Sequence, residues 1–154
     1  MGEEMNAIAL GADEAGFYLK ETIKKFLMKS GYQVEDYGIY NTDPVLYPDI
    51  ALIVAEAIAN HKYDRGILLC GTGIGMAITA NKVPGIRAAV CHDPYSAERS
   101  RKSNNCQIMS MGARIIGEEL AKMLVKIWLD SEFQGGNSNQ KVQRITEIDQ
   151  HYHK

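Results

Sequence analysis

The chain has 154 residues, a length typical of a single domain with a full hydrophobic core. Its 17 Lys and Arg residues nearly balance its 19 Asp and Glu residues, which gives a formal net charge of −2. The basic excess of a nucleic-acid-binding surface is therefore missing. With 45% hydrophobic and 23% charged residues, the composition is that of a globular protein and excludes intrinsic disorder.

Cysteine and histidine spacing argues against structural cross-links and metal sites. Cys70, Cys91 and Cys106 are widely spaced and form no CxxC pair, and no histidine has a second strong ligand at metal-binding spacing. Residues 1–4 are acidic where a signal peptide is basic, and no segment reaches the roughly 20 apolar residues of a membrane span. We therefore expect a cytoplasmic protein that holds no metal and contacts neither membrane nor nucleic acid.

Short apolar runs alternate with longer amphipathic stretches in the first half of the chain. Residues 7–10 predict a buried strand, and the apolar residues of 19–27 lie at helical spacing. A second strand is expected over 33–37. A second helix is expected over 47–60, with Pro48 in its first turn, where a missing N–H costs nothing.

The same alternation continues to the end of the chain. Residues 66–70 predict the strongest strand, which runs into a glycine-rich turn. The remaining expected elements are a helix over 76–81, a strand over 86–91, a helix over 94–104, a strand over 108–111, a helix around 120–127, a flexible loop over 135–139 and a final helix over 142–152.

Strand–helix alternation over the whole chain predicts one α/β domain spanning residues 1–154. Right-handed crossovers would build a Rossmann-like parallel sheet covered by helices on both faces, a three-layer α/β/α sandwich. The last helix follows a glycine-rich loop and has no strand to return to. We therefore expect residues 135–154 to pack on a partner subunit.

Ligands of open α/β sheets bind at the carboxyl ends of the strands. A thiol, carboxylates, a hydroxyl, an imidazole and a guanidinium follow the predicted strands, so we expect them to converge on one edge. The segments that carry them are residues 11–16, 70–75, 92–95 and 112–114.

The glycine-rich segment 70–75 is the most informative of these. Gly71, Gly73 and Gly75 allow a tight turn whose N–H groups point inward at a helix N-terminus, an anion-binding arrangement. Cys70 at its mouth feels the same dipole, and a base beside an oxyanion hole suits proton abstraction next to a carbonyl. A phosphate or dinucleotide loop with a buried structural cysteine fits the spacing equally well, although neither the Walker nor the GxGxxG pattern is present.

Other polar residues at this edge have two interpretations each. Asp13 can accept sugar hydroxyls or cap the following helix, and Glu14 would lie in that helix's first turn. His92 is a candidate acid or base, or a histidine in a polar loop. Arg114 can meet an anion or form a surface ion pair, and the charged run 99–102 predicts a solvated helix face.

Six motifs, in order and covering nearly the whole chain, carry a family resemblance: GADEAG at 11–16, YPD at 47–49, CGTGIGM at 70–76, NKVPGIR at 81–87, SRKSNN at 100–105 and GAR at 112–114. Together they resemble the ribose-5-phosphate isomerase B family, which includes the galactose-6-phosphate isomerase subunits. The resemblance implies strand order 2-1-3-5-4 and aldose–ketose isomerisation through a cis-enediolate, without metal or other cofactor. It also implies homodimers or homotetramers whose sites are completed by the neighbour's C-terminal segment.

The resemblance assigns roles to individual residues. Cys70 matches the base that moves a proton between C1 and C2 of the sugar. The loop that stabilises the intermediate is matched by the amides of Gly71, Gly73, Ile74 and Gly75, together with Thr72. Asp13 matches a carboxylate near the sugar hydroxyls, and Tyr47 matches a tyrosine that lines the pocket. Asn104 matches a substrate-binding asparagine, and Arg114 matches a phosphate contact.

The sequence departs from the family where the family binds phosphate and opens the sugar ring. Glu14 replaces a phosphate-holding histidine and would repel a phosphate, and Ser103 replaces the ring-opening histidine. Residues 137–141 lack a histidine and two arginines, and Lys141 keeps one positive charge. We expect intact proton transfer on ribose 5-phosphate or on another substrate, a tetrose phosphate, a hexose 6-phosphate or an unphosphorylated sugar. His92 is a candidate to replace the missing ring-opening group.

Two other functional classes compete with an isomerase. A non-catalytic sugar- or nucleotide-binding module would be favoured by loss of the thiol base, but Cys70 is present. A phosphatase or transferase with a cysteine nucleophile would need an arginine six residues later, where this chain has Met76. An isomerase is therefore the main prediction.

Overall fold

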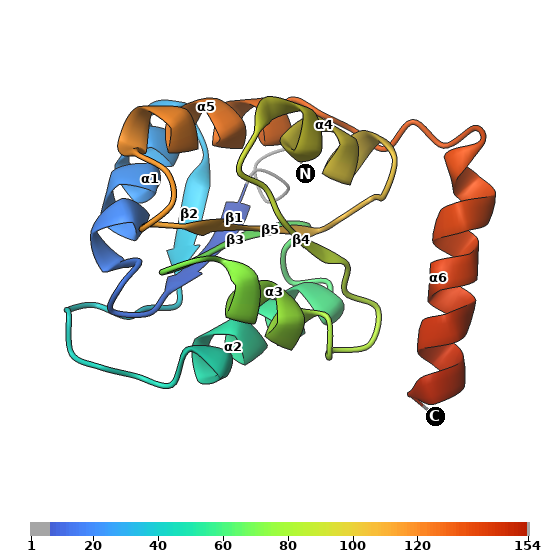
Figure 1. Ribbon diagram of the computed structural model, residues 1–154, viewed down its shortest axis with the longest axis horizontal. Helices are drawn as coiled ribbons and strands as arrows, with labels where there is room; N and C mark the ends of the chain where they lie inside the picture. Colours follow the sequence, from blue (N-terminus) through green and yellow to red (C-terminus); the bar gives the residue numbers. More distant parts are fainter. Residues whose placement is uncertain (1–6, 154) are drawn as a thin grey trace.

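The structure, a computed structural model, describes residues 7–153, so the acidic residues 1–4 lie outside it. Five parallel strands form one sheet in the order β2-β1-β3-β5-β4, which is the implied order (Figure 1). The strands are β1 (Ala7–Ala12), β2 (Gln33–Asp36), β3 (Arg65–Cys70), β4 (Ala88–Val90) and β5 (Ile108–Gly112). The helices are α1 (Phe17–Lys29), α2 (Tyr47–Ala59), α3 (Ile74–Ala80), α4 (Pro94–Lys102), α5 (Glu118–Leu129) and α6 (Ser138–Tyr152).

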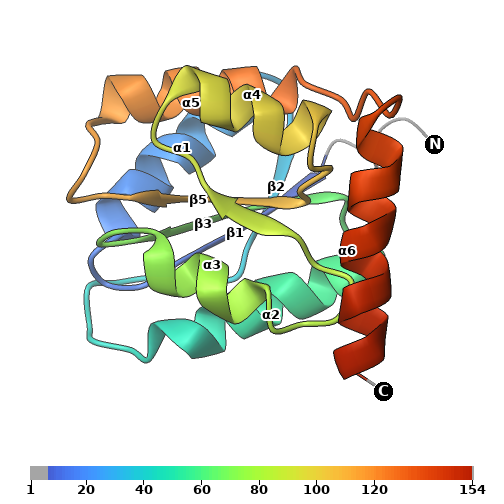
Figure 2. The ribbon, with the colours of Figure 1, turned by 45° about the vertical axis from the view of Figure 1, so that its right-hand side comes forward.

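Helices cover both faces of the sheet, as expected for a three-layer sandwich. Helices α1, α4 and α5 lie on one face, and α2 and α3 lie on the other (Figures 1 and 2). Every residue of β3 is buried, because successive side chains enter opposite layers. Ile67 and Leu69 pack in the apolar cluster of α1 and α5, whereas Leu68 and Cys70 pack in the cluster of α2 and α3.

Some element boundaries differ from the sequence prediction. Helix α6 begins at Ser138, so part of the expected loop 135–139 is helical. In the loop before this helix, Gly135 and Gly136 have positive φ angles of 66° and 59°, in the left-handed region that favours glycine. Strand β4 is shorter than expected, and α3 begins directly after Gly73 instead of at residue 76.

The charged run 99–102 is only in part the solvated helix face that we expect. Arg101 is 7% exposed, and its Nη1 donates to the carbonyl of Cys106 at 2.6 Å. Its Nη2 lies 3.6 Å from the carboxylate of Glu132. The prediction is wrong for Arg101 because α4 turns that side toward the segments after α5 and before β5.

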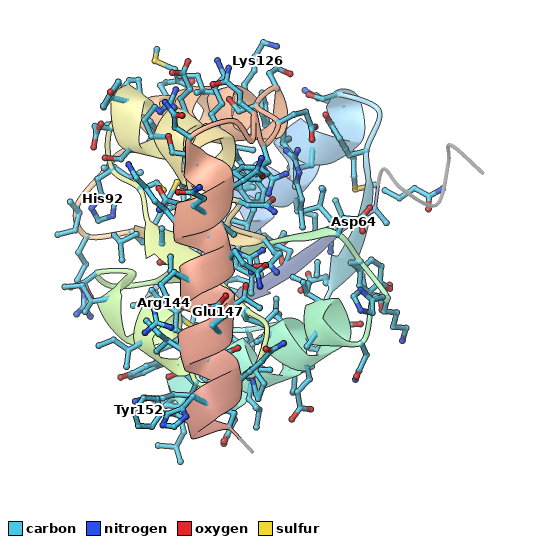
Figure 3. The ribbon with its side chains drawn as sticks, turned by 90° about the vertical axis from the view of Figure 1, so that its right-hand side faces the viewer. Asp64, His92, Lys126, Arg144, Glu147 and Tyr152 are labelled. Carbon is cyan, nitrogen blue, oxygen red and sulfur yellow. The ribbon has the colours of Figure 1, made fainter. Side chains whose placement is uncertain are left out.

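Helix α6 stands apart from the three layers, at one end of the molecule (Figures 1 and 2). Val142 is its one buried residue, and the apolar side chains Ile145 and Ile148 are exposed. Asp149 holds the helix to the domain by accepting the N–H of Gly85 at 2.6 Å. Figure 3 shows Arg144 and Glu147 along the middle of this helix. None of the helices described over residues 7–153 has the length and apolar character needed to cross a membrane.

Candidate active site

The carboxyl ends of β1, β3 and β5 meet at the edge of the sheet opposite α6, on the left in Figure 1. Backbone hydrogen bonds join the segments that leave these strands. Asp13 donates its N–H to the carbonyl of Leu69 at 3.2 Å, and Ala113 donates to the carbonyl of Cys70 at 2.8 Å. The thiol of Cys70 therefore lies between the loop after β1 and the loop after β5.

Cys70 is a free cysteine, 5% exposed, at the last position of β3. Its Sγ accepts the N–H of Gly73 at 3.0 Å. Gly73 precedes α3 with a φ of 79°, in the left-handed region that favours glycine. A backbone N–H and a helix N-terminus both stabilise a thiolate, the form in which a cysteine takes up a proton.

The other two cysteines lie in a different environment. Both are buried and free, and burial raises the pKa of Cys91 to about 11 and that of Cys106 to about 11. Their thiols stay protonated at neutral pH. Cys91 and Cys106 are therefore buried core thiols, with no sign of a role in chemistry.

The glycine-rich loop between β3 and α3 is packed closely from two sides. The ring of Tyr47 covers Gly75 so closely that an added Cβ would collide with it. The end of β5 lies against Thr72, because an added Cβ on Gly112 would lie 2.7 Å from the Cα of Thr72. Thr72 Oγ1 accepts the N–H of Ile74 at 3.2 Å. The structure thus brings Tyr47, Thr72 and the loop glycines together, as predicted.

Ser110 is a residue that the sequence reasoning missed. Its buried hydroxyl donates to the carbonyl of Gly73 at 2.8 Å and so ties the glycine-rich loop to β5. It is the one hydroxyl in the otherwise apolar run Ile108–Met111 of β5. A polar residue inside a buried strand needs a partner, and that signal could have found it.

Asp13 and Glu14 bring two carboxylates to the loop after β1. Asp13 is buried, and its Oδ1 accepts the N–H of Gly16 at 3.0 Å. Burial raises the pKa of Asp13, and so does the charge of Glu14, whereas the Gly16 hydrogen bond and Arg114 oppose the shift. Its carboxyl therefore lies closer to protonation than an ordinary aspartate.

The expected position of Glu14 in the first turn of α1 is wrong. The helix begins at Phe17, because a turn held by the Asp13–Gly16 hydrogen bond comes first. The carboxylate of Glu14 instead accepts the N–H of Val45 at 3.2 Å, in the loop that leads to α2. Glu14 therefore ties that loop to the edge of the site.

Arg114 and His92 complete the group at this edge. The Nη1 of Arg114 would lie 3.2 Å from a Cβ on Gly71, so the guanidinium covers the start of the glycine-rich loop. His92 Nε2 accepts the N–H of Gly112 at 2.8 Å. Arg114 is thus placed to meet an anion bound at the loop.

Two expected site residues lie elsewhere in the chain. Asn104 follows α4 and lines a cavity of about 800 Å³ together with Ile145 and Ile148 of α6. Lys141 is on α6 itself. In Figure 1 the end of α4 and α6 lie at the opposite side of the molecule from the turn between β3 and α3. Neither residue therefore belongs to the Cys70 group of its own chain.

Within residues 7–153, no three His, Cys, Asp or Glu side chains gather closely enough to hold a metal ion. The groups around Cys70 are instead a thiol, backbone amides, a hydroxyl, a carboxyl and a guanidinium. They are suited to moving a proton next to a carbonyl and to stabilising the oxyanion that results.

A protein-family model described as Ribose/Galactose Isomerase matches residues 8–145. The chain belongs to this family. It is 56% identical to a D-erythrulose-4-phosphate isomerase of Pectobacterium atrosepticum, over 92% of this chain and 93% of the relative. It is also 56% identical to a ribose-5-P isomerase B of Listeria innocua, over 93% of this chain and 97% of the relative.

Solved structures agree with family membership. A ribose-5-phosphate isomerase B of Clostridium thermocellum is 48% identical and superposes with a TM-score of 0.93, over 95% of this chain and 99% of that chain. The family model covers the whole Cys70 group, from Asp13 to Arg114. Membership in this family makes the chain an isomerase.

Proposed function

We propose that the chain is an aldose–ketose isomerase of sugar phosphates, of the ribose 5-phosphate/ribulose 5-phosphate type, in which Cys70 is the base. The observation that carries the proposal is the 3.0 Å hydrogen bond from the Gly73 amide to the Cys70 sulfur, at the start of α3 and beside the buried Asp13. A free thiol so placed can hold a proton and release it.

The mechanism moves one proton between neighbouring carbons. The C2–H bond of the aldose breaks, its proton goes to Cys70 Sγ, and the electron pair forms the C1–C2 double bond of an enediolate. The loop amides and Thr72 stabilise the negative oxygen. The thiol returns the proton to C1 while the proton of O2 is transferred to O1, which gives the ketose. The raised pKa of Asp13 suits a carboxyl that exchanges protons with the sugar oxygens.

A tetrose 4-phosphate is a second candidate substrate. The hydroxyl of C4, which would close a furanose ring, carries the phosphate in this sugar, so the substrate is always open. Ser103 stands where the family's ring-opening histidine is expected, and two relatives are named for D-erythrulose 4-phosphate. An open substrate needs no ring-opening group.

A substrate panel tests the proposed function. Purified protein is assayed for aldose–ketose interconversion with ribose 5-phosphate, a tetrose 4-phosphate, allose and galactose 6-phosphates and the free sugars. We expect turnover of at least one sugar phosphate. Turnover of none would contradict the proposal, and preference for the tetrose would assign the second candidate.

We propose further that the enzyme is a cytoplasmic homodimer, or a dimer of such dimers, with each site shared between subunits. The support is geometric. The end of α4, which Asn104 follows, and α6, which carries Lys141, lie across the molecule from the turn between β3 and α3 (Figure 1), and Ile145 and Ile148 of α6 are exposed. A neighbouring subunit could bring this end of the molecule to the Cys70 group. Three free cysteines suit a reducing compartment.

Complementation between two inactive variants tests the shared site. Cys70→Ala and Asn104→Ala subunits are co-refolded or co-expressed and compared with each variant alone. If Asn104 acts on the partner's site, random pairing leaves one intact site in each mixed dimer and restores roughly a quarter of the wild-type sites. A mixture no more active than the separate variants would contradict sharing.

A further inference from the structure

His92 lies at the point where the pairing of β4 with β5 stops. The ladder runs as far as Val90 opposite Ser110, and Cys91 extends it by donating its N–H to the Ser110 carbonyl at 3.0 Å. One step further along β5, the N–H of Gly112 donates to Nε2 of the His92 imidazole at 2.8 Å. The side chain thus continues the link between the two strands beyond the end of the backbone ladder.

Gly112 lies at the centre of the proposed site's framework. It pairs directly with Cys70 in the register of β3 and β5. It also packs so closely on Thr72 that an added Cβ would lie 2.7 Å from the threonine Cα. The next two residues, Ala113 and Arg114, donate their N–H groups to the carbonyls of Cys70 and of the residue after it, at 2.8 and 3.0 Å. The position of Gly112 therefore fixes the base, the loop and the backbone that carries Arg114.

The hydrogen bond also defines the state of the imidazole. Because the backbone N–H donates, Nε2 must be the unprotonated nitrogen, and the proton of the neutral ring is on Nδ1. Burial lowers the pKa of His92, against the charge of the neighbouring Asp93, and so favours the neutral ring. With the lone pair of Nε2 held by Gly112, the ring has no free lone pair with which to take a proton from a sugar hydroxyl.

We propose that His92 is a positioning residue of this enzyme. By accepting the Gly112 N–H through Nε2, it holds the end of β5 and, through it, the arrangement of Cys70, Thr72 and Arg114. The inference rests on the proposed isomerase function. It assigns His92 a different task from the ring-opening role expected from the sequence, in which the imidazole itself would exchange a proton with a cyclic substrate.

Three substitutions separate the two roles. The side-chain oxygen of His92→Gln can reach the place of Nε2 and accept the Gly112 N–H. The amide of His92→Asn ends near the place of Nδ1, one atom short of the place of Nε2, and His92→Leu offers no acceptor. The values of kcat and KM are measured with ribose 5-phosphate, which is cyclic, and with a tetrose 4-phosphate, which is not. Thermal unfolding of each variant shows whether it is folded.

A positioning role predicts a loss of roughly tenfold in kcat/KM for the Asn and Leu variants, the size of one hydrogen bond, on every substrate that the wild type turns over. The Gln variant should return to within about threefold of the wild type. A ring-opening acid or base would instead lose about 10²–10⁴-fold, on the cyclic substrate alone, and the Gln variant would be as poor as the Leu variant. A loss confined to the cyclic substrate would overturn the proposal, and so would a Gln variant as poor as the Leu variant.

A spectroscopic measurement tests the same inference without substrate. In ¹⁵N-labelled wild-type protein at neutral pH, we expect the His92 ring to show a protonated Nδ1 and an unprotonated Nε2. A ring protonated on Nε2 would overturn the proposal, whatever the variants do. Because this result needs no turnover, it stands even if the substrate panel fails, in which case the isomerase function is what has failed.

Discussion

Glu14 adds a second negative charge to the edge of a site that is expected to hold a phosphorylated sugar. Its carboxylate accepts the Val45 N–H, and its charge contributes to the raised pKa of Asp13. The side chain of Glu14 therefore acts on the loop before α2 and on the carboxyl of Asp13. Substitutions at this position can separate the two effects.

Replacing Glu14 with Gln removes the charge and keeps an oxygen that can accept the Val45 N–H. We expect KM for a sugar phosphate to fall about fivefold, because a like-charge contact near 4 Å in a water-like environment costs about 1 kcal/mol. Steady-state kinetics at low ionic strength measure the change. The unphosphorylated sugar is the control, and an equal change in its KM would show that the charge of Glu14 does not act on the phosphate.

At the scale of elements, a buried ion pair joins α1 to β2. Lys20 is fully buried, and its Nζ lies 2.6 Å from Oδ2 of Asp36, which also accepts from Lys24 at 3.0 Å. Burial by itself would raise the pKa of Asp36, but the hydrogen bonds from Lys20, Gly38 and Lys24 outweigh it and hold the pKa below its ordinary value. The carboxylate form therefore stabilises the fold.

Asp36→Asn should lower the free energy of unfolding by about 3 kcal/mol at pH 7, because it removes the nearer counter-charge of the buried Lys20 ammonium and leaves it the more distant carboxylate of Glu21, at 3.4 Å. The folded-state pKa of Asp36 is depressed, so its contribution is complete above the unfolded value near 3.8 and is lost as the pH falls through the lower folded value. Urea unfolding at pH 7 and below pH 4 measures the difference between variant and wild type.

The difference between Asp36→Asn and the wild type should shrink on acidification. An equal difference at both pH values would contradict the ion-pair explanation. The double variant Lys20→Met/Asp36→Leu is the matched control. It removes both charges together and should stay much closer to the wild type than the single variant, because neither charge is left alone in the core.

The order of the elements could be predicted from the sequence because the apolar residues of each segment follow either the spacing of a helix or that of a buried strand. The continuous run of β3 and the helical spacing of α1 leave little choice, and the carboxyl ends of the strands follow from them. Boundaries set by tertiary contacts could not be predicted. Arg101 is buried in a contact with Glu132, which is far away in the sequence. Helix α1 begins only at Phe17 because the turn held by Asp13 comes first. Neither contact shows in the local spacing of apolar residues.

At the scale of the whole molecule, the candidate site divides into two groups at opposite ends of one chain. Residues that follow strands, such as Cys70 and Arg114, could be placed from the sequence, since parallel strands end at the same edge. Asn104 could not, because it follows a helix that runs back to the other end of the sheet. The family resemblance grouped Asn104 with Cys70. Because the two lie far apart in one chain, we propose that Asn104 acts at the site of a second subunit.

Removing the C-terminal segment tests whether the site depends on a second subunit. A chain ending at residue 134 should stay folded, because Val142 is the one residue that α6 buries in its own chain. It should become monomeric and lose activity, since it lacks both the apolar surface of α6 and Lys141. Light scattering coupled to size-exclusion chromatography gives the mass, and circular dichroism checks the fold. A truncated dimer with full activity would contradict the role of α6.

The central claim is that the Cys70 thiol moves the proton between C1 and C2. The most direct measurement is kcat of Cys70→Ala and Cys70→Ser on the best substrate of the wild type, with the fold checked by thermal unfolding. The account predicts a loss of about 10²–10⁴-fold or more for the alanine variant, the contribution of a positioned base. The serine variant should be similarly impaired, because a hydroxyl is a far weaker acid than a thiol. A folded Cys70→Ala enzyme that keeps full turnover would contradict the account.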